Sequence, residues 1–568
     1  MDVALVFPPA VSLPNRLYHA LPLLAGALHR AGHRARALDL NLLAADLLLT
    51  DARTDRYLRL AHHHADSSSP EARRTLDARE AGLRRGPASK ETLRDPVRFF
   101  EPATFRDAFW NVVDALAFFG QLDPIVSPHR ETFAADLGRF AEEDPWTVHR
   151  DLREEALLDA VLAGAPGLVG ITLAFPEQAA ETVRLAKRLR ERAPDVHLAL
   201  GGPLVTQFAD KWLEDGFAFR FVDSVCVGDG GETIVRLAEA LAGNGALEEV
   251  PNLARPDGRG GVRRPGTVLL DDLDALPSPD FGAADLSLEF APQPIFPAMT
   301  ARGCYWGRCT FCSIGWRENY RLASEETIRR DLVDLARTHG ARYVQLQDSS
   351  LPPRSAPVVA RVVEEEGLDL HWVAGMKFER ALLDPAYCEA LARGGCRSLM
   401  LGFESATQRL VDRMDKGFRV EDVPRMLDNL RGAGISAELL WFVGFPSETR
   451  REALHTARTL AGLRERFGLA AFVSEYQLHP DTIVFDRPRD FGLEVTGEEN
   501  GVCSYVAEAG MQIEDVLEVK EMLADSNNRT LVCNGSHLPH LVETGLDLSG
   551  LARPLVVSER LVEACERD

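Results

Sequence analysis

Three cysteines stand close together in the middle of the chain, and their spacing suits iron–sulfur chemistry. Cys304, Cys309 and Cys312 lie in the run Gly-Cys-Tyr-Trp-Gly-Arg-Cys-Thr-Phe-Cys over residues 303–312. Iron–sulfur clusters are normally held by cysteine thiolates, usually four of them. The nearest cysteine before this run is the distant Cys226, so no fourth thiol is close in sequence. Three thiolates can hold three corners of a [4Fe–4S] cluster and leave the fourth iron open to a substrate.

Two simpler explanations for these cysteines remain open. A structural zinc ion usually takes a closed set of four ligands, which three thiols do not complete. Free cysteines also pack as small hydrophobic residues in protein cores. The close spacing of the three thiols, with glycine, tryptophan and arginine between them, favours the cluster over both explanations.

The residues that follow the cysteines predict alternating helices and strands. We expect helices near 324–338, 357–366, 385–392 and 420–433, and strands near 343–346, 371–374, 398–402 and 437–443. Such a series packs most economically as a partial barrel of parallel strands, with its chemistry at the carboxyl ends of the strands. We therefore predict a partial (β/α) barrel over residues 291–490. Polar residues that follow its strands are Asp348, Lys377, Arg380 and Glu404.

The first 250 residues predict another α/β domain. Strands are expected near 3–7, 35–40, 167–173, 196–200 and 224–227, with helices near 17–28, 177–192 and 233–241. Strands that alternate with helices favour a doubly wound parallel sheet. In such sheets, ligands bind outside the carboxyl ends of the strands, where the strand order switches. Glycine-rich turns at 201–203 and 228–231 stand at those ends, where bare backbone permits close approach of a ligand.

Three further segments complete the expected organisation. Residues from about 45 to 160 are mostly charged and helical in pattern, so we expect a helical insertion within the N-terminal domain. Residues 251–290 are rich in glycine, proline and arginine and are interpreted as a hairpin-like linker. Residues 491–568 form a C-terminal region whose role the sequence does not indicate.

Composition excludes several classes of function. The chain has 64 basic and 86 acidic residues and a formal charge of −22, which argues against general binding to nucleic acid. Nine scattered cysteines are an odd number and do not form a disulfide framework. The N-terminus lacks the pattern of a signal peptide, and no apolar run reaches the ~20 residues that span a bilayer. We therefore expect a cytoplasmic protein that binds neither nucleic acid nor membrane.

The cysteine run resembles the cluster motif of the radical S-adenosylmethionine (SAM) enzymes. Phe311, directly before the last cysteine, is similar to the aromatic residue of that motif. Four residues separate the first two cysteines, where the commonest form has three; some cobalamin-binding branches, including enzymes that modify ribosomal peptides, resemble this longer version. The resemblance covers about residues 1–45 and 160–490, and it implies that the partial barrel is a (β/α)6 barrel.

The same resemblance implies a set of SAM-binding residues. Glu404 follows an apolar strand, as does the group that meets the SAM ribose in the family. Gly444, in Gly-Phe-Pro, resembles the family's turn beside the adenine. Arg380 and Lys377 could pair with the SAM carboxylate, because an arginine fork suits carboxylates. Solvation at the surface explains both equally well, and Asp348 could simply cap a turn. The SAM-binding residues are thus expected to be Phe311, Asp348, Arg380, Glu404, Ser405 and Gly444.

The N-terminal domain resembles the cobalamin-binding domain found ahead of radical SAM barrels. The residues expected to bind cobalamin are Pro8, Pro9, Thr172, Gly201, Gly202, Gly228, Gly230 and Glu232. The Asp-x-His-x-x-Gly motif, whose histidine binds cobalt in other cobalamin enzymes, is absent; Asp195 and His197 mimic it with the wrong spacing to the next glycine. The resemblance therefore implies cobalamin without a histidine ligand. A dinucleotide site fits less well because no G-x-G-x-x-G follows the first strand, and a sheet that binds nothing remains open.

Together these resemblances imply a cobalamin-dependent radical SAM enzyme, most simply a methyltransferase. Such an enzyme would methylate an unactivated carbon of a peptide or natural product through a 5′-deoxyadenosyl radical and methylcobalamin. Its cofactors would be a [4Fe–4S] cluster, SAM and cobalamin, with a reducing partner such as a flavodoxin or ferredoxin. Two alternatives stay open: a rearrangement or cyclisation that uses cobalamin without methyl transfer, and a non-enzymatic cobalamin or redox sensor.

Residues outside these motifs are expected to be structural. Cys226, Cys388 and Cys396 lie in or beside predicted elements. Cys503 and Cys533 could hold a second cluster, although packing is the simpler explanation. The run His62-His63-His64 could bind a metal opportunistically, but a solvated helix face explains it as well.

Overall fold

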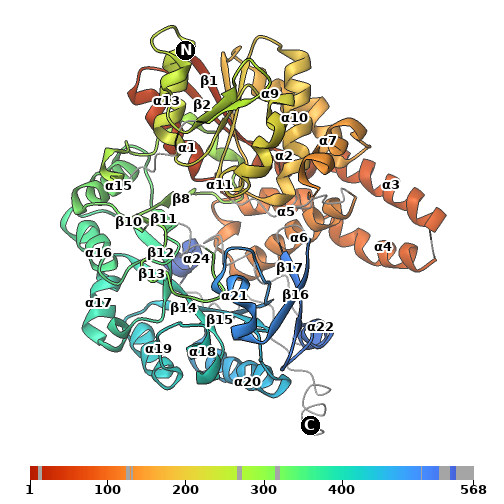
Figure 1. Ribbon diagram of the computed structural model, residues 1–568. Helices are drawn as coiled ribbons and strands as arrows, with labels where there is room; N and C mark the ends of the chain where they lie inside the picture. Colours follow the sequence, from red (N-terminus) through yellow and green to blue (C-terminus); the bar gives the residue numbers. More distant parts are fainter. Residues whose placement is uncertain are drawn as a thin grey trace. The chain divides into compact units, whose positions relative to one another are not determined.

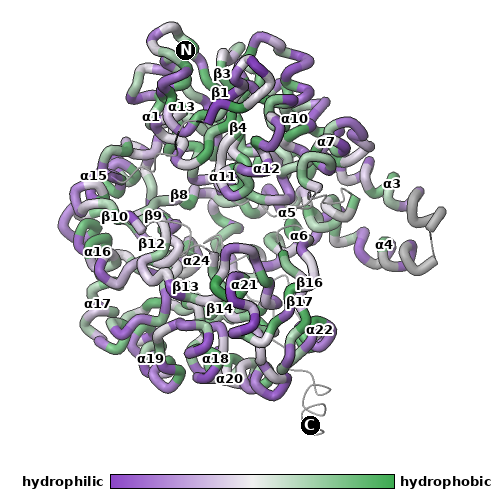
Figure 2. Tube along the Cα trace, viewed as in Figure 1, coloured by the Kyte–Doolittle hydropathy of each residue, from purple (hydrophilic) through white to green (hydrophobic). Residues whose placement is uncertain are grey.

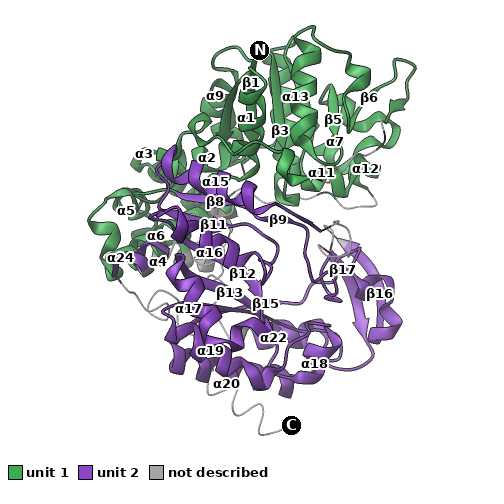
Figure 3. Ribbon diagram, turned by 90° about the vertical axis from the view of Figure 1, so that its left-hand side faces the viewer, with its two compact units in different colours: residues 1–294 green, residues 295–568 purple. Residues whose placement is uncertain are grey.

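The computed structural model describes residues 1–9, 16–68, 70–122, 128, 132–264, 266, 272–313, 320–499, 502–522 and 538–544. By its internal contacts, the chain forms two compact units, residues 1–294 and 295–568 (Figure 3). Each unit contains one large sheet. None of the helices described is both long enough and apolar enough to cross a membrane.

The sheet of the first unit has the strand order β2-β1-β3-β4-β5-β6-β7 (Figure 1). Its strands are β1 (Asp2–Phe7), β2 (Arg34–Asp39), β3 (Leu168–Thr172), β4 (His197–Gly201), β5 (Ser224–Cys226), β6 (Leu253–Pro256) and β7 (Val262–Arg263). The first five strands pair in parallel. The order 2-1-3-4-5 places the switch point between β1 and β3, and ligands bind at that position in doubly wound sheets.

Helices cover both faces of this sheet, as the apolar sequence of its strands requires. Strands β1 and β3 are buried along almost their whole length, and they are largely hydrophobic in Figure 2. Helices α1 (Ala20–Arg30) and α13 (Gly230–Leu241) contact each other on one face. Helix α10 (Ala179–Arg192) lies on the other face, where it contacts α7 (Phe133–Glu143) and α9 (Leu158–Leu162).

The regular elements described between β2 and β3 are all helices. Besides α7 and α9, this insertion contains α2 (Leu40–Leu48), α3 (Asp51–Ser68), α4 (Pro70–Leu83), α5 (Gly86–Arg94), α6 (Pro102–Gln121), α8 (Val148–Leu152) and a π-helical turn, η2 (Arg153–Leu157). Its core is aromatic, with Tyr57, Phe105 and Phe119 fully buried. The π-turn buries Arg153, whose guanidinium binds the carboxylates of Asp144 and Glu181.

The segment 251–290 is more than the linker that its composition indicates. Strand β6 pairs antiparallel with β5, and β7 pairs antiparallel with β6, so a hairpin extends the sheet of the first unit. The rest of the described segment is anchored to the same unit, because the carboxylate of Asp280 accepts a hydrogen bond from His29 at 2.6 Å.

The second unit contains the predicted partial barrel. Six parallel strands stand in chain order: β8 (Ile295–Ala298), β11 (Tyr343–Leu346), β12 (His371–Lys377), β13 (Cys396–Glu404), β14 (Ser436–Val443) and β15 (Ala470–Glu475). The helices that connect them are α15 (Glu325–Arg337), α16 (Ala356–Glu365), α17 (Pro385–Arg393), α19 (Val423–Gly432) and α20 (Arg450–Phe467). Right-handed crossovers that all advance in one direction place these helices on one face and leave the other face as the lumen. Strands β8 and β15 are the two edges, so the barrel is open.

Two C-terminal elements pack against this barrel. The antiparallel hairpin β16 (Leu493–Glu499) and β17 (Val502–Ala507) joins a hydrophobic cluster with residues at the carboxyl ends of β14 and β15, including Phe445 and Tyr476. Helix α22 (Ile513–Met522) contacts β14, β15 and α20. Helix α24 (Leu538–Thr544) buries Leu538 against Ile295 and Tyr343, which belong to the first residues of their strands. The hairpin therefore covers one end of the barrel and α24 the other.

Candidate active site

The cysteine loop follows β8 and the short strand β9 (Ala301–Arg302), so it lies at the carboxyl end of the barrel. Cys304, Cys309 and Cys312 are all partly buried. The amide of Cys312 donates to the carbonyl of Cys309 at 3.2 Å, which turns the chain between these two thiols. The three sulfurs thus occupy one short loop at the edge of the sheet where barrel chemistry takes place.

The loop is held by the segment that follows helix α18 (Gln408–Arg413). The amide of Thr310 donates to the carbonyl of Met414 at 3.1 Å, and the indole of Trp306 donates to the carbonyl of Asp415 at 2.7 Å. Gly417 has a φ of +72°, and a Cβ at this position would lie 2.4 Å from the Trp306 ring. Only glycine therefore allows the tryptophan to pack here.

The thiols lie close enough to influence one another's charge. Burial raises the pKa of Cys309 to about 11, the positive charge of Lys416 acts against this, and the charges of Cys312, Glu404 and Cys304 raise it further. A bound metal reverses this balance, because coordination deprotonates a thiol outright. The donor set of three gathered thiols fits three corners of an iron–sulfur cluster.

Glu404 and Lys416 form a buried ion pair beside these thiols. The Nζ of Lys416 lies 2.8 Å from the Oε1 of Glu404, and both side chains are at most 10% exposed. Burial by itself lowers the pKa of Lys416, but the charges of Glu404, Cys309 and Cys312 outweigh burial, so its pKa is raised. The ammonium group therefore stays positively charged next to two of the three thiols.

The backbone of β13 aims Glu404 into this position. Glu404 has a φ of +61°, and the register of β13 against β14 shifts between Gly402 and Glu404. Bulges of this kind re-aim a side chain at functional sites, and positive φ in a non-glycine residue is strained. A Cβ on Gly402 would lie 2.6 Å from Glu404 Oε1 and 2.7 Å from Lys416 Nζ, so the missing side chain makes room for the ion pair.

Lys416 is the site residue that the sequence analysis missed. It belongs to a charged stretch, Arg-Met-Asp-Lys-Gly, that has the composition of a solvated turn. The available signal was its position just before Gly417, at a sharp turn shortly after the strand that carries Glu404. That signal does not indicate burial.

Asp348 and Ser405 are engaged in structural hydrogen bonds. The carboxylate of Asp348 accepts from the amide of Thr300 at 3.1 Å and from its hydroxyl at 2.6 Å, which ties the end of β11 to the start of the cysteine loop. Burial raises the pKa of Asp348 to about 6, although these hydrogen bonds act against the shift. The fully buried hydroxyl of Ser405 lies 3.3 Å from that of Thr456 on α20. Contact of either residue with SAM stays a prediction.

The two cations after β12 differ in their surroundings. The Nζ of Lys377 lies 2.8 Å from Glu379 Oε1 and 4.2 Å from the centroid of the Trp306 ring. Glu379 also accepts a hydrogen bond from Tyr305, so Lys377 helps to hold the cysteine loop. Arg380 is exposed at the first position of a short 3-10 helix. Its pairing with the SAM carboxylate stays a prediction.

Gly444 and Phe311 lie on the side of β14. Gly444 has a φ of +97°, and its amide donates to Glu448 Oε2 at 2.6 Å. Burial raises the pKa of Glu448 to about 8, so this carboxyl is largely protonated at neutral pH. The ring of Phe311 lies 5.0 Å from that of Phe442, with the Lys416 ammonium 5.7 Å from its centroid. Phe311 thus packs against β14 and Gly444 directly follows that strand; contact of either residue with SAM stays a prediction.

In the first unit, bare backbone surrounds the carboxyl ends of β3, β4 and β5. Gly202 has a φ of +114°, and a Cβ there would lie 2.3 Å from the carbonyl of Leu173. Gly228 has a φ of +109°, and its amide donates to the Thr206 hydroxyl at 3.0 Å. Gly202 thus packs on the backbone of Leu173, and the two turns form a glycine cradle at the sheet edge where doubly wound folds bind ligands. Contact of this cradle with a large flat cofactor such as cobalamin stays a prediction.

The other residues expected to bind cobalamin lie at the same sheet edge or at the helix that follows it. Thr172 and Gly201 end their strands and pair with each other in register. Pro8 and Pro9 directly follow β1, and Gly230 begins α13. Glu232 is in the first turn of α13, with its carboxylate 3.6 Å from Arg236.

Gln178 joins the two strands at the switch point, and no sequence pattern indicated it. Its amide nitrogen donates to the carbonyl of Pro8 at 2.6 Å. Its amide oxygen accepts from the backbone amides of Ala174 and Phe175, at 3.1 and 3.0 Å. The side chain is completely buried, so it fixes the end of β1 to the loop after β3.

Other candidate residues lie away from these sites. His197 is the first residue of β4, at the amino end of the strand, and contacts the Ser224 hydroxyl at 2.9 Å. Cys388, Cys396 and Cys503 are buried, and Cys503 packs in the hydrophobic cluster of the hairpin. Cys533 lies outside the described residues. Of the histidine run, His62 is within reach of Asp77 and Glu80 on the neighbouring helix α4.

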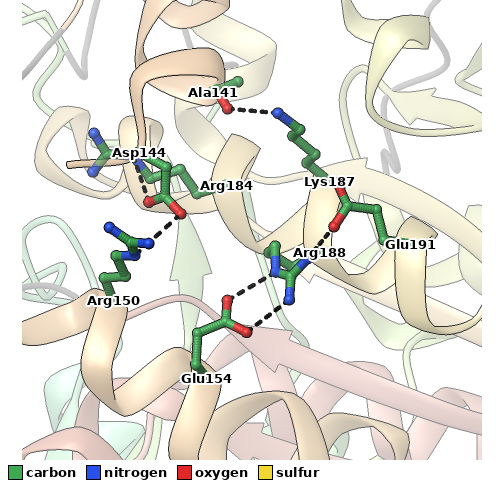
Figure 4. A pocket seen from close by; sticks show the side chains of 8 residues that line it. All are labelled: Ala141, Asp144, Arg150, Glu154, Arg184, Lys187, Arg188 and Glu191. Atoms are coloured by element: carbon green, nitrogen blue, oxygen red, sulfur yellow. Dashed lines mark hydrogen bonds and ion pairs between the residues drawn. The ribbon is translucent and has the colours of Figure 1, made fainter. Parts of the chain in front are cut away.

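A cavity of about 380 Å³ in the first unit is not the site (Figure 4). Its charged groups form ion pairs with one another: Arg188 with Glu154 and Glu191, and Arg150 with Asp144. The cavity lies among α7, α8, η2 and α10 rather than at the carboxyl ends of the strands. The residues that line it are Ala141, Asp144, Arg150, Glu154, Arg184, Lys187, Arg188 and Glu191.

Comparisons with known proteins agree with this geometry. Residues 299–460 match the model of the Radical SAM superfamily. The chain is 27% identical to an uncharacterised methyltransferase of Pyrococcus horikoshii, over 52% of this chain and 63% of that protein. It is 25% identical to the anaerobic magnesium-protoporphyrin IX monomethyl ester cyclase of Rubrivivax gelatinosus, over 53% of this chain and 55% of that protein. The chain thus spans less than two thirds of either relative.

The fold of the chain resembles that of a solved enzyme. The radical SAM methyltransferase TsrM from Kitasatospora setae, with cobalamin and a [4Fe–4S] cluster bound, superposes with a TM-score of 0.54 and 15% identity. The match covers 97% of this chain and 89% of that one. At this identity the likeness establishes the fold. Residues 299–460, which match the radical SAM superfamily, contain the cysteine loop and the parallel strands β11 to β14.

Proposed function

We propose that this protein is a cobalamin-dependent radical SAM enzyme that methylates an unactivated carbon of a peptide or natural product. The observation that carries the proposal is the gathering of three thiols, Glu404 and a buried lysine at the carboxyl end of the partial barrel. The glycine cradle in the first unit and the fold shared with a cobalamin-containing enzyme support the second cofactor.

The residues of the chain would bind, orient and shield these groups. Cys304, Cys309 and Cys312 would hold three corners of the cluster. Glu404 would meet the SAM ribose, and Lys416 would both fix Glu404 and place a positive charge near the amino acid end of SAM. When bound, the cluster supplies the electron that cleaves SAM, and cobalamin supplies the transferred methyl group. The hairpin β16–β17 and the aromatic side chains beneath it would exclude water from this end of the barrel.

Iron loading tests the cluster part of the proposal. Anaerobic reconstitution of the full chain is expected to give about four iron atoms per chain and a cubane signal in electron paramagnetic resonance (EPR) after reduction. Replacing Cys304, Cys309 and Cys312 together with alanine should abolish the signal. Cys226→Ala, which removes a thiol from β5 in the other unit, is the matched control and should retain it. Full retention of the signal in the triple variant would refute the proposal.

A second function is favoured by the similarity to the anaerobic cyclase. The chain would then use cobalamin and SAM for a cyclisation or rearrangement without methyl transfer. The products of SAM distinguish the two: a methyltransferase of this kind forms S-adenosylhomocysteine and 5′-deoxyadenosine in step with substrate turnover. Formation of 5′-deoxyadenosine without S-adenosylhomocysteine during turnover would favour the cyclase.

A further inference from the structure

The switch point of the first unit carries an aromatic side chain that is left half exposed. Phe175 follows β3 and is 48% exposed, although large hydrophobic side chains are normally buried. Its ring stands edge-on to Phe7, with centroids 6.4 Å apart, and to Tyr18, at 6.5 Å. Phe7 and Tyr18 are themselves stacked at 4.2 Å. Three rings thus form one group beside the ends of β1 and β3.

The exposed ring is held in place by the backbone. Gln178 accepts a hydrogen bond from the amide of Phe175 and donates to the carbonyl of Pro8. Because both strand ends are fixed by one buried side chain, the loop that carries Phe175 cannot simply fold inward to bury the ring. An apolar surface held open at a switch point suits a ligand with a flat, apolar face.

We infer that Phe175 lies against the lower face of the corrin ring and leaves cobalt without a protein ligand on that side. The inference rests on the proposed function, since it requires cobalamin in this unit. It extends that function by naming a side chain of the first unit that contacts the cofactor. Phe175 is therefore a cofactor-binding residue, and it keeps water and imidazoles from the metal.

His19 is the competing residue. It precedes α1, and its ring centroid lies 4.9 Å from that of Tyr18 at an angle of 48°. Tyr18 therefore already packs against the imidazole. Phe175, by contrast, presents its ring to solvent from the end of β3. A measurement that detects a nitrogen bound to cobalt separates the two residues.

The test uses the full chain, labelled with ¹⁵N-histidine, loaded with cobalamin and reduced to the Co(II) state. A protein imidazole on cobalt splits the EPR lines into doublets, whereas the cofactor's own unlabelled base splits them into triplets. Wild-type protein is expected to show neither splitting, and Phe175→His is expected to show the doublet. Trp146→His, at another exposed aromatic residue of the first unit, is the matched control and should leave the spectrum unchanged. Phe175→Ala should weaken cobalamin binding by about 2- to 10-fold.

Several results would overturn the inference. A doublet in the wild type that His19→Ala removes would assign the lower face to His19. A triplet would assign it to the cofactor's own base. Phe175→His protein that binds cobalamin without a doublet would show that this side chain does not face the metal. Absence of cobalamin binding by the wild type would overturn both the inference and the cobalamin part of the proposed function, while the iron measurement would be unaffected.

Discussion

Removing the ammonium group of Lys416 tests whether the buried ion pair holds the site together. In Lys416→Met, the apolar stem is largely kept but Glu404 loses its 2.8 Å partner in a setting where both side chains are at most 10% exposed. Breaking a buried pair by removing one partner costs about 3–5 kcal/mol, because the remaining charge is left uncompensated. For a unit of this size, that corresponds to a fall in melting temperature of at least about 6 °C.

The double variant Lys416→Met/Glu404→Gln separates stability from function. Because it removes both charges, most of the lost stability should return. Neither the single nor the double variant should cleave SAM. The melting temperature is measured on the reduced, iron-free protein by circular dichroism, so that the cluster does not contribute. Lys90→Met, at a buried lysine of the first unit paired with Asp46, is the matched control for SAM cleavage and should retain it. A Lys416→Met protein that melts within about 1 °C of wild type, or a double variant that is no more stable than the single one, would refute the reasoning.

Three further predictions concern single residues. Glu448 has a pKa of about 8 in the folded protein, against 4.5 for the free carboxyl group. The stability that its protonated form contributes is therefore present below pH 4.5 and is lost as the pH rises toward 8, by about 5 kcal/mol at most. Urea unfolding at several pH values should show that Glu448→Gln flattens this decline. Gly417→Ala places a Cβ 2.4 Å from the Trp306 ring at a residue with positive φ. The variant should lose about 1–3 kcal/mol of stability and bind less iron after reconstitution. An unchanged iron content would contradict the role of Gly417 in holding the cysteine loop. Gly202→Ala places a Cβ 2.3 Å from the backbone carbonyl of Leu173, so cobalamin retention on gel filtration should be lost while iron content persists; loss of both would indicate general misfolding instead.

Most of the architecture follows from local sequence patterns. Apolar runs such as residues 3–7 and 398–402 predict strands because their length and composition suit burial on both faces. Alternation with amphipathic helices then selects parallel sheets, and the cysteine spacing places the chemistry at one loop. Glycine, proline and arginine between residues 252 and 270 indicate the hairpin-like character of the segment 251–290, in which β6 and β7 pair. Its strands β6 and β7 are short, and they form because β5 offers an unpaired edge.

The sequence by itself determined the cysteine triad, the two α/β units and the strand ends at which polar residues gather. Those features depend on neighbours in the chain, through side-chain type, spacing and periodicity. Tertiary structure alone decided which of the charged residues face the site. By residue type and by their neighbours in the chain, Lys416 and Asp348 resemble many surface residues. Packing nevertheless buries Lys416 beside the thiols and ties Asp348 to Thr300. Burial and pairing depend on contacts between distant segments, and no local pattern records them.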